Sequence, residues 1–265
     1  MSGRTPGTEG REPRGARRSL ERIDPHTVKV LYISGAGRSG TTVLSAILGE
    51  LDGFFFAGEL VQLWAKLGLP GWLCGCGQGL EACDVWQDVR RVDPDVGDQH
   101  VAALMAGSLR SAIRAKKLPL ALTPGGQTRL FPPEVTRRLE SLYRAIALVT
   151  RARVIVDTSK TPAYGRALQL LPKVDLHVLH VVRDARAVAF SWRRHKQHDS
   201  DGGEDSLFRI ARLGPANAAL RWTAANAQAE AYWAFSKPRR YLRIRYEDFV
   251  RRPETVLPRI IDLVG

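Results

Sequence analysis

The sequence predicts an α/β fold of three layers, in which helices cover both faces of a mostly parallel sheet. Three observations favour this fold. Short apolar runs typical of buried strands alternate with longer helical patterns along the chain. A glycine-rich turn follows the first of these runs and leads into a helical pattern. No internal repeat and no second domain is evident, so we expect one sheet.

Length and composition agree with one domain. The 265 residues are 44% hydrophobic and 25% charged, which is ordinary for a globular protein with a substantial core. Residues 1–27 contain Arg, Gly, Pro and Glu but no apolar signal-peptide core, so we expect a disordered basic leader followed by a domain over 28–265. No apolar run approaches the ~18 residues that span a bilayer. These features predict a cytoplasmic protein without a membrane span.

The formal net charge of +13 predicts an anionic partner. Lys and Arg are spread along the chain, and neither an aromatic RNA-binding signature nor zinc-finger spacing accompanies them. A small phosphorylated ligand or an anionic acceptor therefore fits the charge as well as nucleic acid does.

The first half of the chain begins with a strand. Residues 28–34, VKVLYIS, are mostly apolar and β-branched, which is typical of a buried strand. A short apolar patch, GFFFA, lies at 53–57, and a Gly- and Cys-rich loop occupies 68–83. Helical patterns are predicted over 41–51, 60–67, 98–117 and 133–150.

The second half continues the alternation. Strands are predicted over 153–157 (RVIVD), 175–183 (DLHVLHVVR) and 239–246 (RRYLRIRY). Helices are predicted over 185–195, 215–235 and 253–264, with a polar loop at 196–206. Residues Ser34, Asp157, Arg183 and Tyr246 stand at predicted strand ends. Because ligands bind beyond the carboxyl ends of parallel strands, these four are candidates for a site.

The turn after the first strand has the outline of a phosphate-binding loop. Its glycines, Gly35, Gly37 and Gly40, allow a tight turn that points several N–H groups inward. The loop of ATPases reads GxxxxGK[ST], with Lys on the terminal phosphates. Here Thr41 stands in place of that Lys. A tight turn without a ligand is the alternative interpretation.

The side chains of the loop favour a ligand. Arg38 supplies a forked positive charge suited to phosphate or sulfate oxygens. Ser39, Thr41 and Thr42 supply hydroxyls, and the helix that begins near Thr41 adds its positive N-terminal end.

GAGRSGTT, residues 35–42, resembles the 5′-phosphosulfate loop of sulfotransferases that use 3′-phosphoadenosine 5′-phosphosulfate (PAPS). A second segment, VVRDARAVAFS, resembles the 3′-phosphate site of the same family, with Arg183 and Ser191 eight positions apart. A forked cation and a hydroxyl suit a dianion. Taken in isolation, Arg183 fits an ion pair with Asp184, or with a Glu elsewhere, better than a ligand contact; the first loop and the order of the two motifs favour the ligand. The resemblance implies a soluble, bacterial-type member with a fold like that of P-loop nucleotide hydrolases and PAPS as co-substrate, without a metal.

The C-terminal segment RIRYEDFVRRPETVLPRIIDLVG is similar to the last strand and helix of the family, which adds Tyr246 to the expected co-substrate contacts. Members continue past this helix into a Gly- and basic-rich segment that closes over the 3′-phosphate, whereas this sequence ends at Gly265. We expect either a truncated chain or another segment that supplies those contacts.

Sulfuryl transfer to a hydroxyl needs a base and a cation near the leaving phosphate. In the family branch that acts on sugars or protein tyrosines, a Glu about twenty positions beyond the loop Arg serves as base, and Glu59 fits that spacing. An apolar patch precedes Glu59, and such a setting raises the pKa of a carboxyl group. The alternative is a Glu that complements a helix dipole. Lys160 resembles a lysine that relatives use near the leaving group and acceptor.

Two other functions stay open at this point. A P-loop kinase would use Asp157 on magnesium, although Asp157 could instead cap a turn. A basic nucleic-acid-binding protein would use the net charge alone. For a sulfotransferase, the acceptor could be a carbohydrate, a glycolipid, a small metabolite or a tyrosine hydroxyl.

CGCGQGLEAC places Cys74, Cys76 and Cys83 in one loop. The spacing favours structural packing first, a disulfide second and a metal third, because no His is near and the spacing is unlike common zinc motifs. Tryptophans at 64, 72 and 86 flank the loop and either line an acceptor cleft or pack in the core.

Overall fold

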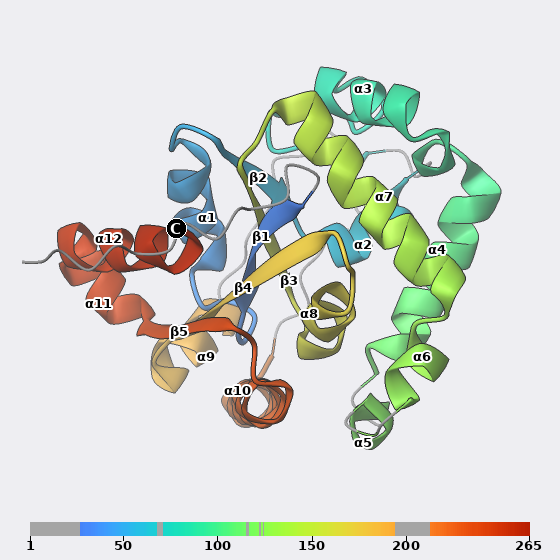
Figure 1. Ribbon diagram of the computed structural model, residues 1–265. Coiled ribbons are helices and arrows are strands. Elements are labelled where there is room, and N and C mark those ends of the chain that lie inside the picture. The colour runs from blue at the N-terminus through green and yellow to red at the C-terminus, as the bar shows by residue number, and fades with distance from the viewer. Residues whose placement is uncertain (1–26, 68–70, 115–116, 122, 124, 194–212) are drawn as a thin grey trace, which may run out of the picture.

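The sheet has five strands, all parallel, in the order β2-β3-β1-β4-β5 (Figure 1). The computed structural model describes residues 27–67, 71–114, 117–121, 123, 125–193 and 213–265. The strands are β1 (Val28–Ser34), β2 (Phe54–Gly58), β3 (Val154–Lys160), β4 (Val174–Val182) and β5 (Arg240–Arg245). The predicted leader, apart from Thr27, and the polar loop at 196–206 lie outside the described residues.

Helices join the strands and cover both faces of the sheet. They are α1 (Thr41–Gly49), α2 (Leu60–Lys66), α3 (Asp84–Val92), α4 (Gln99–Ala112), α5 (Leu118–Ala121), α6 (Gly126–Leu130), α7 (Pro133–Thr150), α8 (Pro162–Gln169), α9 (Ala185–Arg193), α10 (Pro215–Ser236), α11 (Tyr246–Arg251) and α12 (Pro253–Val264). A short 3-10 helix, η1, spans Pro94–Val96. No described helix is long and apolar enough to cross a membrane.

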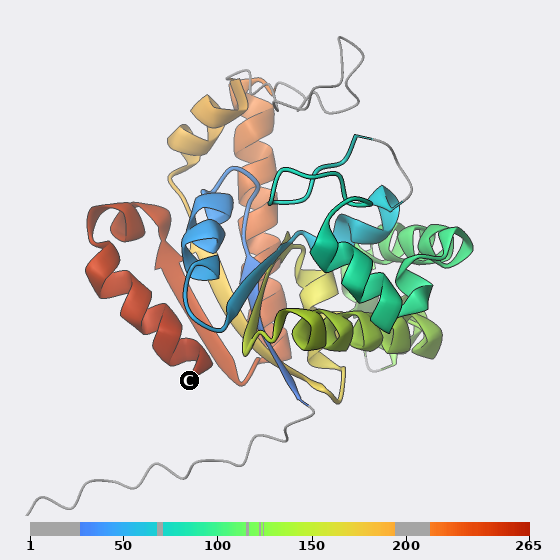
Figure 2. The same ribbon diagram turned by 90° about the horizontal axis from the view of Figure 1, so that it is seen from above.

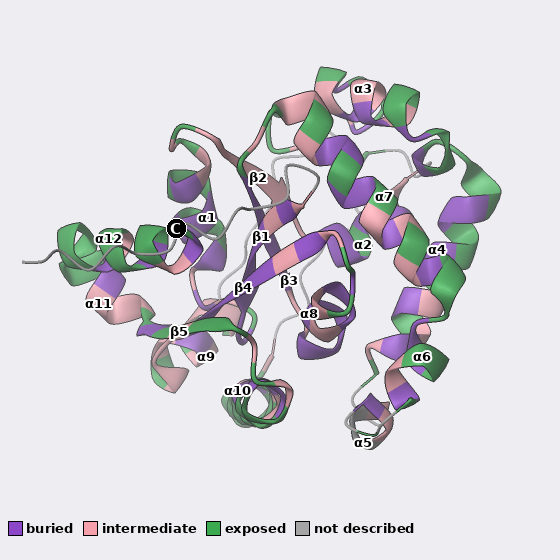
Figure 3. Ribbon diagram, viewed as in Figure 1, coloured by how far each residue is buried: buried purple, intermediate pink, exposed green. Residues whose placement is uncertain are grey.

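The core lies in two layers, one on each side of the sheet. Alternate residues of a strand face opposite sides, so Leu31 and Ile33 of β1 pack with α1, α11 and α12, whereas Val30 and Tyr32 pack with α7, α8 and α10. Figure 2 shows the two groups of helices on either side of the strands, and Figure 3 shows that the central strands are largely buried. The three-layer α/β prediction is confirmed.

The third strand differs from its prediction. It was expected to end at Asp157, but β3 continues to Lys160, where it still pairs with Ser34 of β1. The polar run DTSK looks like a loop in sequence, yet pairing with both neighbouring strands keeps it extended and mostly buried. Asp157 is therefore inside a strand, and Lys160 takes the place at the strand end. Tyr246, likewise, begins α11 directly after β5.

Candidate active site

The loop between β1 and α1 bends sharply against two neighbouring segments. Gly35 (φ 141°) lies so close to β4 that a Cβ there would come within 2.3 Å of the Val181 carbonyl oxygen. Gly40 (φ 78°) lies against Tyr246, whose ring would be 2.0 Å from such a Cβ. Both positions require glycine because backbone angle and space agree. The loop is thereby held at the carboxyl end of the central strands, as predicted.

Arg38 and Ser191 are brought together from distant parts of the sequence. Arg38 Nε donates to Ser191 Oγ at 3.2 Å, and Arg38 Nη2 donates to the Ser191 carbonyl oxygen at 3.3 Å. Arg183 joins them, because its Nη1 donates to the Arg38 carbonyl oxygen at 3.0 Å. Two guanidinium groups and one hydroxyl therefore meet at the ends of β1 and β4.

Tyr246 supports this cluster rather than pointing away from it. The Arg183 guanidinium carbon lies 4.8 Å from the centre of the Tyr246 ring, a cation–π distance. The alternative ion pair between Arg183 and Asp184 is not formed, since Asp184 pairs with Arg186 at 2.9 Å. Tyr246 thus lies between Gly40 of the loop and Arg183.

The charges and the unpaired hydrogen-bond donors of the cluster suit an anionic ligand. Burial, together with the nearby charge of Arg183, lowers the pKa of the Arg38 guanidinium. Among the described residues, Ser39 Oγ and Arg183 Nε are buried without a hydrogen-bond partner. Buried polar groups normally have partners, so these orphaned groups fit a phosphate or sulfate oxygen. Thr41 is buried beside them at the start of α1, whereas Gly37 and Thr42 are exposed.

Glu59 and Lys160 form an ion pair at the ends of β2 and β3. The second oxygen of Glu59 accepts a hydrogen bond of 2.5 Å from Gln62 Nε2, in the first turn of α2. The Glu59 side chain is 32% exposed. Its surroundings are therefore more polar than the apolar patch before it suggests, and the carboxylate is held in place by two donors.

Backbone conformation singles out two of the predicted residues. Four described non-glycine residues have positive φ, and two of them, Arg151 and Lys237, end helices, where this conformation is common. The other two are Arg38 (φ 67°) and Lys160 (φ 63°). Such conformations cost free energy and concentrate at functional sites. Their presence at both cations supports a role for this end of the sheet.

Asp157 has a different surrounding from a metal ligand. It is completely buried, and its oxygens accept hydrogen bonds from the Tyr143 hydroxyl, from Ser159 N at 2.7 Å and from Ser159 Oγ at 2.5 Å. Ser159 Oγ in turn accepts from Val61 N at 2.9 Å, in the first turn of α2. Burial raises the pKa of Asp157 to about 6. This network holds the start of α2 on β3 and so positions Glu59. Because both oxygens of Asp157 accept hydrogen bonds inside the protein, Asp157 does not fit the role of a magnesium ligand in a kinase.

Lys66 is a further cation that sequence reasoning missed. Burial lowers the pKa of Lys66, and the charges of Glu59 and Lys160 also affect this pKa. The three groups therefore interact electrostatically. The Lys66 Nζ lies 4.3 Å from the centre of the Trp72 ring. Its position seven residues after Glu59, about two helical turns on, was the available signal. Trp64 and Trp86 are core residues, leaving Trp72 as the tryptophan of this loop beside the site.

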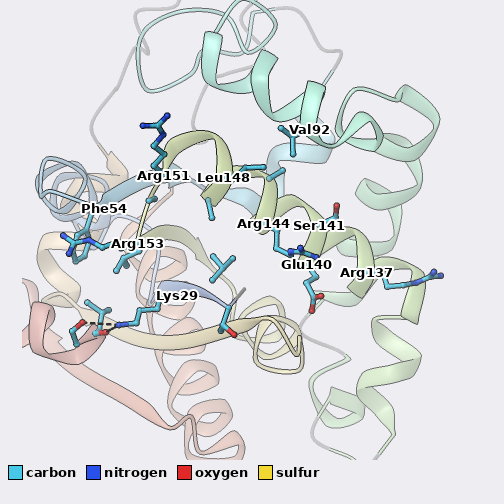
Figure 4. Close-up of a pocket in the computed structure, with 18 of the residues that line it drawn as sticks. Lys29, Phe54, Val92, Arg137, Glu140, Ser141, Arg144, Leu148, Arg151 and Arg153 are labelled. Atoms are coloured by element: carbon cyan, nitrogen blue, oxygen red, sulfur yellow. Dashed lines mark hydrogen bonds between the residues drawn. The ribbon is translucent and has the colours of Figure 1, made fainter. Parts of the chain in front are cut away.

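Two pockets lie at opposite ends of the sheet. A pocket of about 350 Å³ begins at Ala36 and Gly37 of the loop and is bounded by Trp192, Arg221 and Trp222. A larger pocket of about 960 Å³ lies where β1 and β3 begin and includes Lys29, Arg144 and Arg153 (Figure 4). Ligands of parallel sheets bind at the carboxyl ends, so the smaller pocket is the relevant one despite its size.

Comparison with known proteins places these features in a family. A model described as "Sulfotransferase family" matches residues 31–265. Among solved structures, the sulfotransferase domain from the curacin biosynthetic pathway is similar, with 21% identity and a TM-score of 0.52 over 89% of this chain and 73% of that one. The sulfotransferase domain from the Synechococcus PCC 7002 olefin synthase gives 21% and 0.53 over 92% and 76%. No curated protein matches the chain.

Proposed function

This chain belongs to the sulfotransferase family, and we propose that it moves a sulfuryl group from PAPS to a hydroxyl acceptor. The observation that carries this choice of donor is the meeting of Arg38, Arg183 and Ser191 beside a glycine loop with orphaned buried donors. PAPS has anionic groups at both its 5′ and 3′ positions. A site with two forked cations suits such a ligand better than a single phosphate.

The loop and the cluster take different ends of the donor in this proposal. The N-terminal end of α1, Ser39 and Thr41 hold the 5′-phosphosulfate. Arg183 and Ser191 hold the 3′-phosphate, with Arg38 between the two groups. The pocket bounded by Trp192 and Trp222 lies next to Gly37 and offers aromatic surface to the adenine ring.

The acceptor side of the proposal uses the residues at the ends of β2 and β3. The bound donor supplies an activated sulfuryl group. A bond forms between the acceptor oxygen and sulfur while the bond from sulfur to the 5′-phosphate oxygen breaks. Glu59 accepts the proton of the acceptor hydroxyl, and the electron pair leaves on the 5′-phosphate. Lys160 orients Glu59 through their ion pair and, with Arg38, offsets charge on the departing bisphosphate.

The acceptor in this proposal is a small molecule, a carbohydrate or another hydroxyl compound. Lys66 interacts electrostatically with Glu59 and lies over the Trp72 ring, and in this proposal Lys66 and Trp72 form the wall that the acceptor approaches. An aromatic face next to a cation suits a ring that carries hydroxyl groups, or an acceptor with an acidic group.

Ligand-dependent stability tests the donor. Adenosine 3′,5′-bisphosphate should raise the melting temperature by several degrees without magnesium, because it binds only the folded state, whereas ATP with magnesium should not. Equal stabilisation by ATP and magnesium would favour the kinase instead. Polynucleotide binding that survives Arg38→Ala and Arg183→Ala but weakens with salt would favour a nucleic-acid-binding protein. Transfer of labelled sulfate from PAPS to a panel of hydroxyl compounds then identifies the acceptor.

A further inference from the structure

The loop between α2 and α3 brings the three cysteines of the chain together. Cys74, Cys76 and Cys83 are all free thiols, and their sulfur atoms lie within 4.8 Å of one another. This loop lies at the same end of the sheet as the phosphate-binding loop (Figure 2). Cys83 is buried in the core and Cys74 packs against it, but the proposed transfer reaction uses none of the three thiols.

A tight turn and a short hairpin in the backbone bring the three sulfur atoms close together. Gly77 N donates to the Cys74 carbonyl oxygen at 2.9 Å and Cys74 N donates to the Gln78 carbonyl oxygen at 2.7 Å, which closes a tight turn around Cys76. Leu80 N donates to the Trp72 carbonyl oxygen at 3.0 Å, so the turn ends a short hairpin. Cys83 follows as the N-cap residue of α3.

The loop has almost no core of its own. Among residues 71–83, only Leu80 and Cys83 are buried. A cross-link between the thiols would add to the few apolar contacts that hold this segment. Two kinds of cross-link are available to thiols: a disulfide, which joins two of them, and a metal ion, which joins all three.

The spacing of the sulfur atoms favours a metal ion over a disulfide as the cross-link. Cys76 Sγ and Cys83 Sγ are 3.7 Å apart, far from the ~2.05 Å of a disulfide bond. Zinc binds thiolates at about 2.3 Å in a tetrahedron, whose edge is then about 3.8 Å. The Cys76–Cys83 separation is close to that edge, and all three sulfurs lie within 4.8 Å of one another. A disulfide would leave the third thiol unused, whereas a metal explains why all three converge.

We propose that Cys74, Cys76 and Cys83 bind a thiophilic metal ion, with Zn²⁺ as the expected occupant. Three thiolates are soft ligands that select zinc over magnesium or calcium. Each thiol releases its proton when it binds the ion. Cys76 is exposed, so the fourth position of the tetrahedron opens to solvent and takes a water molecule. The sequence interpretation, which put a metal last for these residues, is revised by the three-dimensional arrangement.

A metal here would also organise the neighbouring wall of the site. Trp72 belongs to the hairpin that contains Cys74 and Cys76, and Lys66 lies over its ring. Holding the hairpin therefore holds the aromatic ring against the cation next to Glu59. The metal is structural in this account and takes no part in bond making, so its presence can be tested without any assay of transfer.

The experiment measures metal in protein purified under reducing conditions. Elemental analysis should find roughly one zinc per chain, and exchange with Co²⁺ should give the thiolate-to-cobalt charge-transfer band and the visible bands of tetrahedral coordination. Cys76→Ser removes an exposed ligand without disturbing the core, and its zinc content should fall to background. Gln78→Ala changes the same turn but keeps all three thiols, and should retain zinc.

Three results would overturn the proposal. One is wild-type protein that stays free of zinc and shows no cobalt band although its thiols are reduced. Another is full zinc occupancy in Cys76→Ser. The third is a disulfide between two of the three cysteines in freshly isolated protein, established by mass spectrometry of alkylated peptides. If Cys76→Ser fails to fold, chelation of the wild-type protein, followed by zinc titration and cobalt spectra, decides the same question.

Discussion

Arg38 Nε lies 3.2 Å from Ser191 Oγ, although 153 positions separate the two residues in the sequence. The contact joins the loop after β1 to helix α9 after β4. Because β1 and β4 are neighbours in the sheet, the groups expected to bind the two ends of PAPS become one cluster. Arg38 is therefore the residue through which we expect the two motifs to act on the same ligand.

Removal of Arg38 should weaken binding of adenosine 3′,5′-bisphosphate. Charge-assisted hydrogen bonds are worth about 1.5–3 kcal/mol each, so Arg38→Ala should raise the dissociation constant by roughly tenfold to a hundredfold. Isothermal titration calorimetry measures this directly. Arg91→Ala, on an exposed arginine of α3, is the matched control and should bind normally. Unchanged affinity of Arg38→Ala would remove the arginine from the co-substrate site.

Replacement of Glu59 by Gln should lower turnover and leave binding intact. The amide keeps the shape of the side chain but accepts no proton, and a general base contributes about 10²- to 10⁴-fold to the rate. We expect kcat to fall within that range while adenosine 3′,5′-bisphosphate binds as in the wild type. Glu134→Gln, on the exposed start of α7, serves as control. Near-normal turnover in Glu59→Gln would assign the base to another group.

Lys66→Met should impair transfer without unfolding the protein. Methionine conserves the length and apolar stem of the side chain, so the packing on Trp72 is largely kept. The lost charge acts on Glu59, and we expect kcat/KM for the acceptor to fall by about tenfold or more. Melting temperature should change little. Lys29→Met, at the opposite end of the sheet, should transfer sulfate normally; equal activity of the two variants would exclude Lys66 from the site.

Asp157→Asn should alter the pH dependence of stability. The pKa of Asp157 is raised from 3.8 to about 6 in the folded protein, so its stabilising contribution is complete below pH 3.8 and is lost as pH rises through 6. The advantage of the wild type over the variant should shrink by roughly 2 kcal/mol between about pH 4.5 and 7.5. Urea unfolding across this range measures it, with Asp88→Asn as an exposed control. A difference independent of pH would contradict the raised pKa.

Much of the fold follows from local sequence. Local sequence is enough to predict the first strand from the run VKVLYIS, the turn from the glycines after it, and the helix from the pattern that follows. The short polar run DTSK could not be recognised as strand, because its extension depends on pairing with β1 and β2. The role of Asp157 changed with it: a strand-end residue became a buried group that holds the start of α2.

The sequence by itself determined which chemistry is available: a phosphate-type loop without lysine, the cations Arg38, Arg183 and Lys160, and a carboxylate at Glu59. Only the tertiary structure decided which of these groups meet. Glu59 and Lys160 form an ion pair although 101 positions separate them. Lys66 lies near Glu59, and the three thiols lie near one another, only because of how α2 and the loop after it pack. The order of the strands in the sheet determines which of these side chains come into contact. That order depends on contacts between distant segments, which local propensity does not encode.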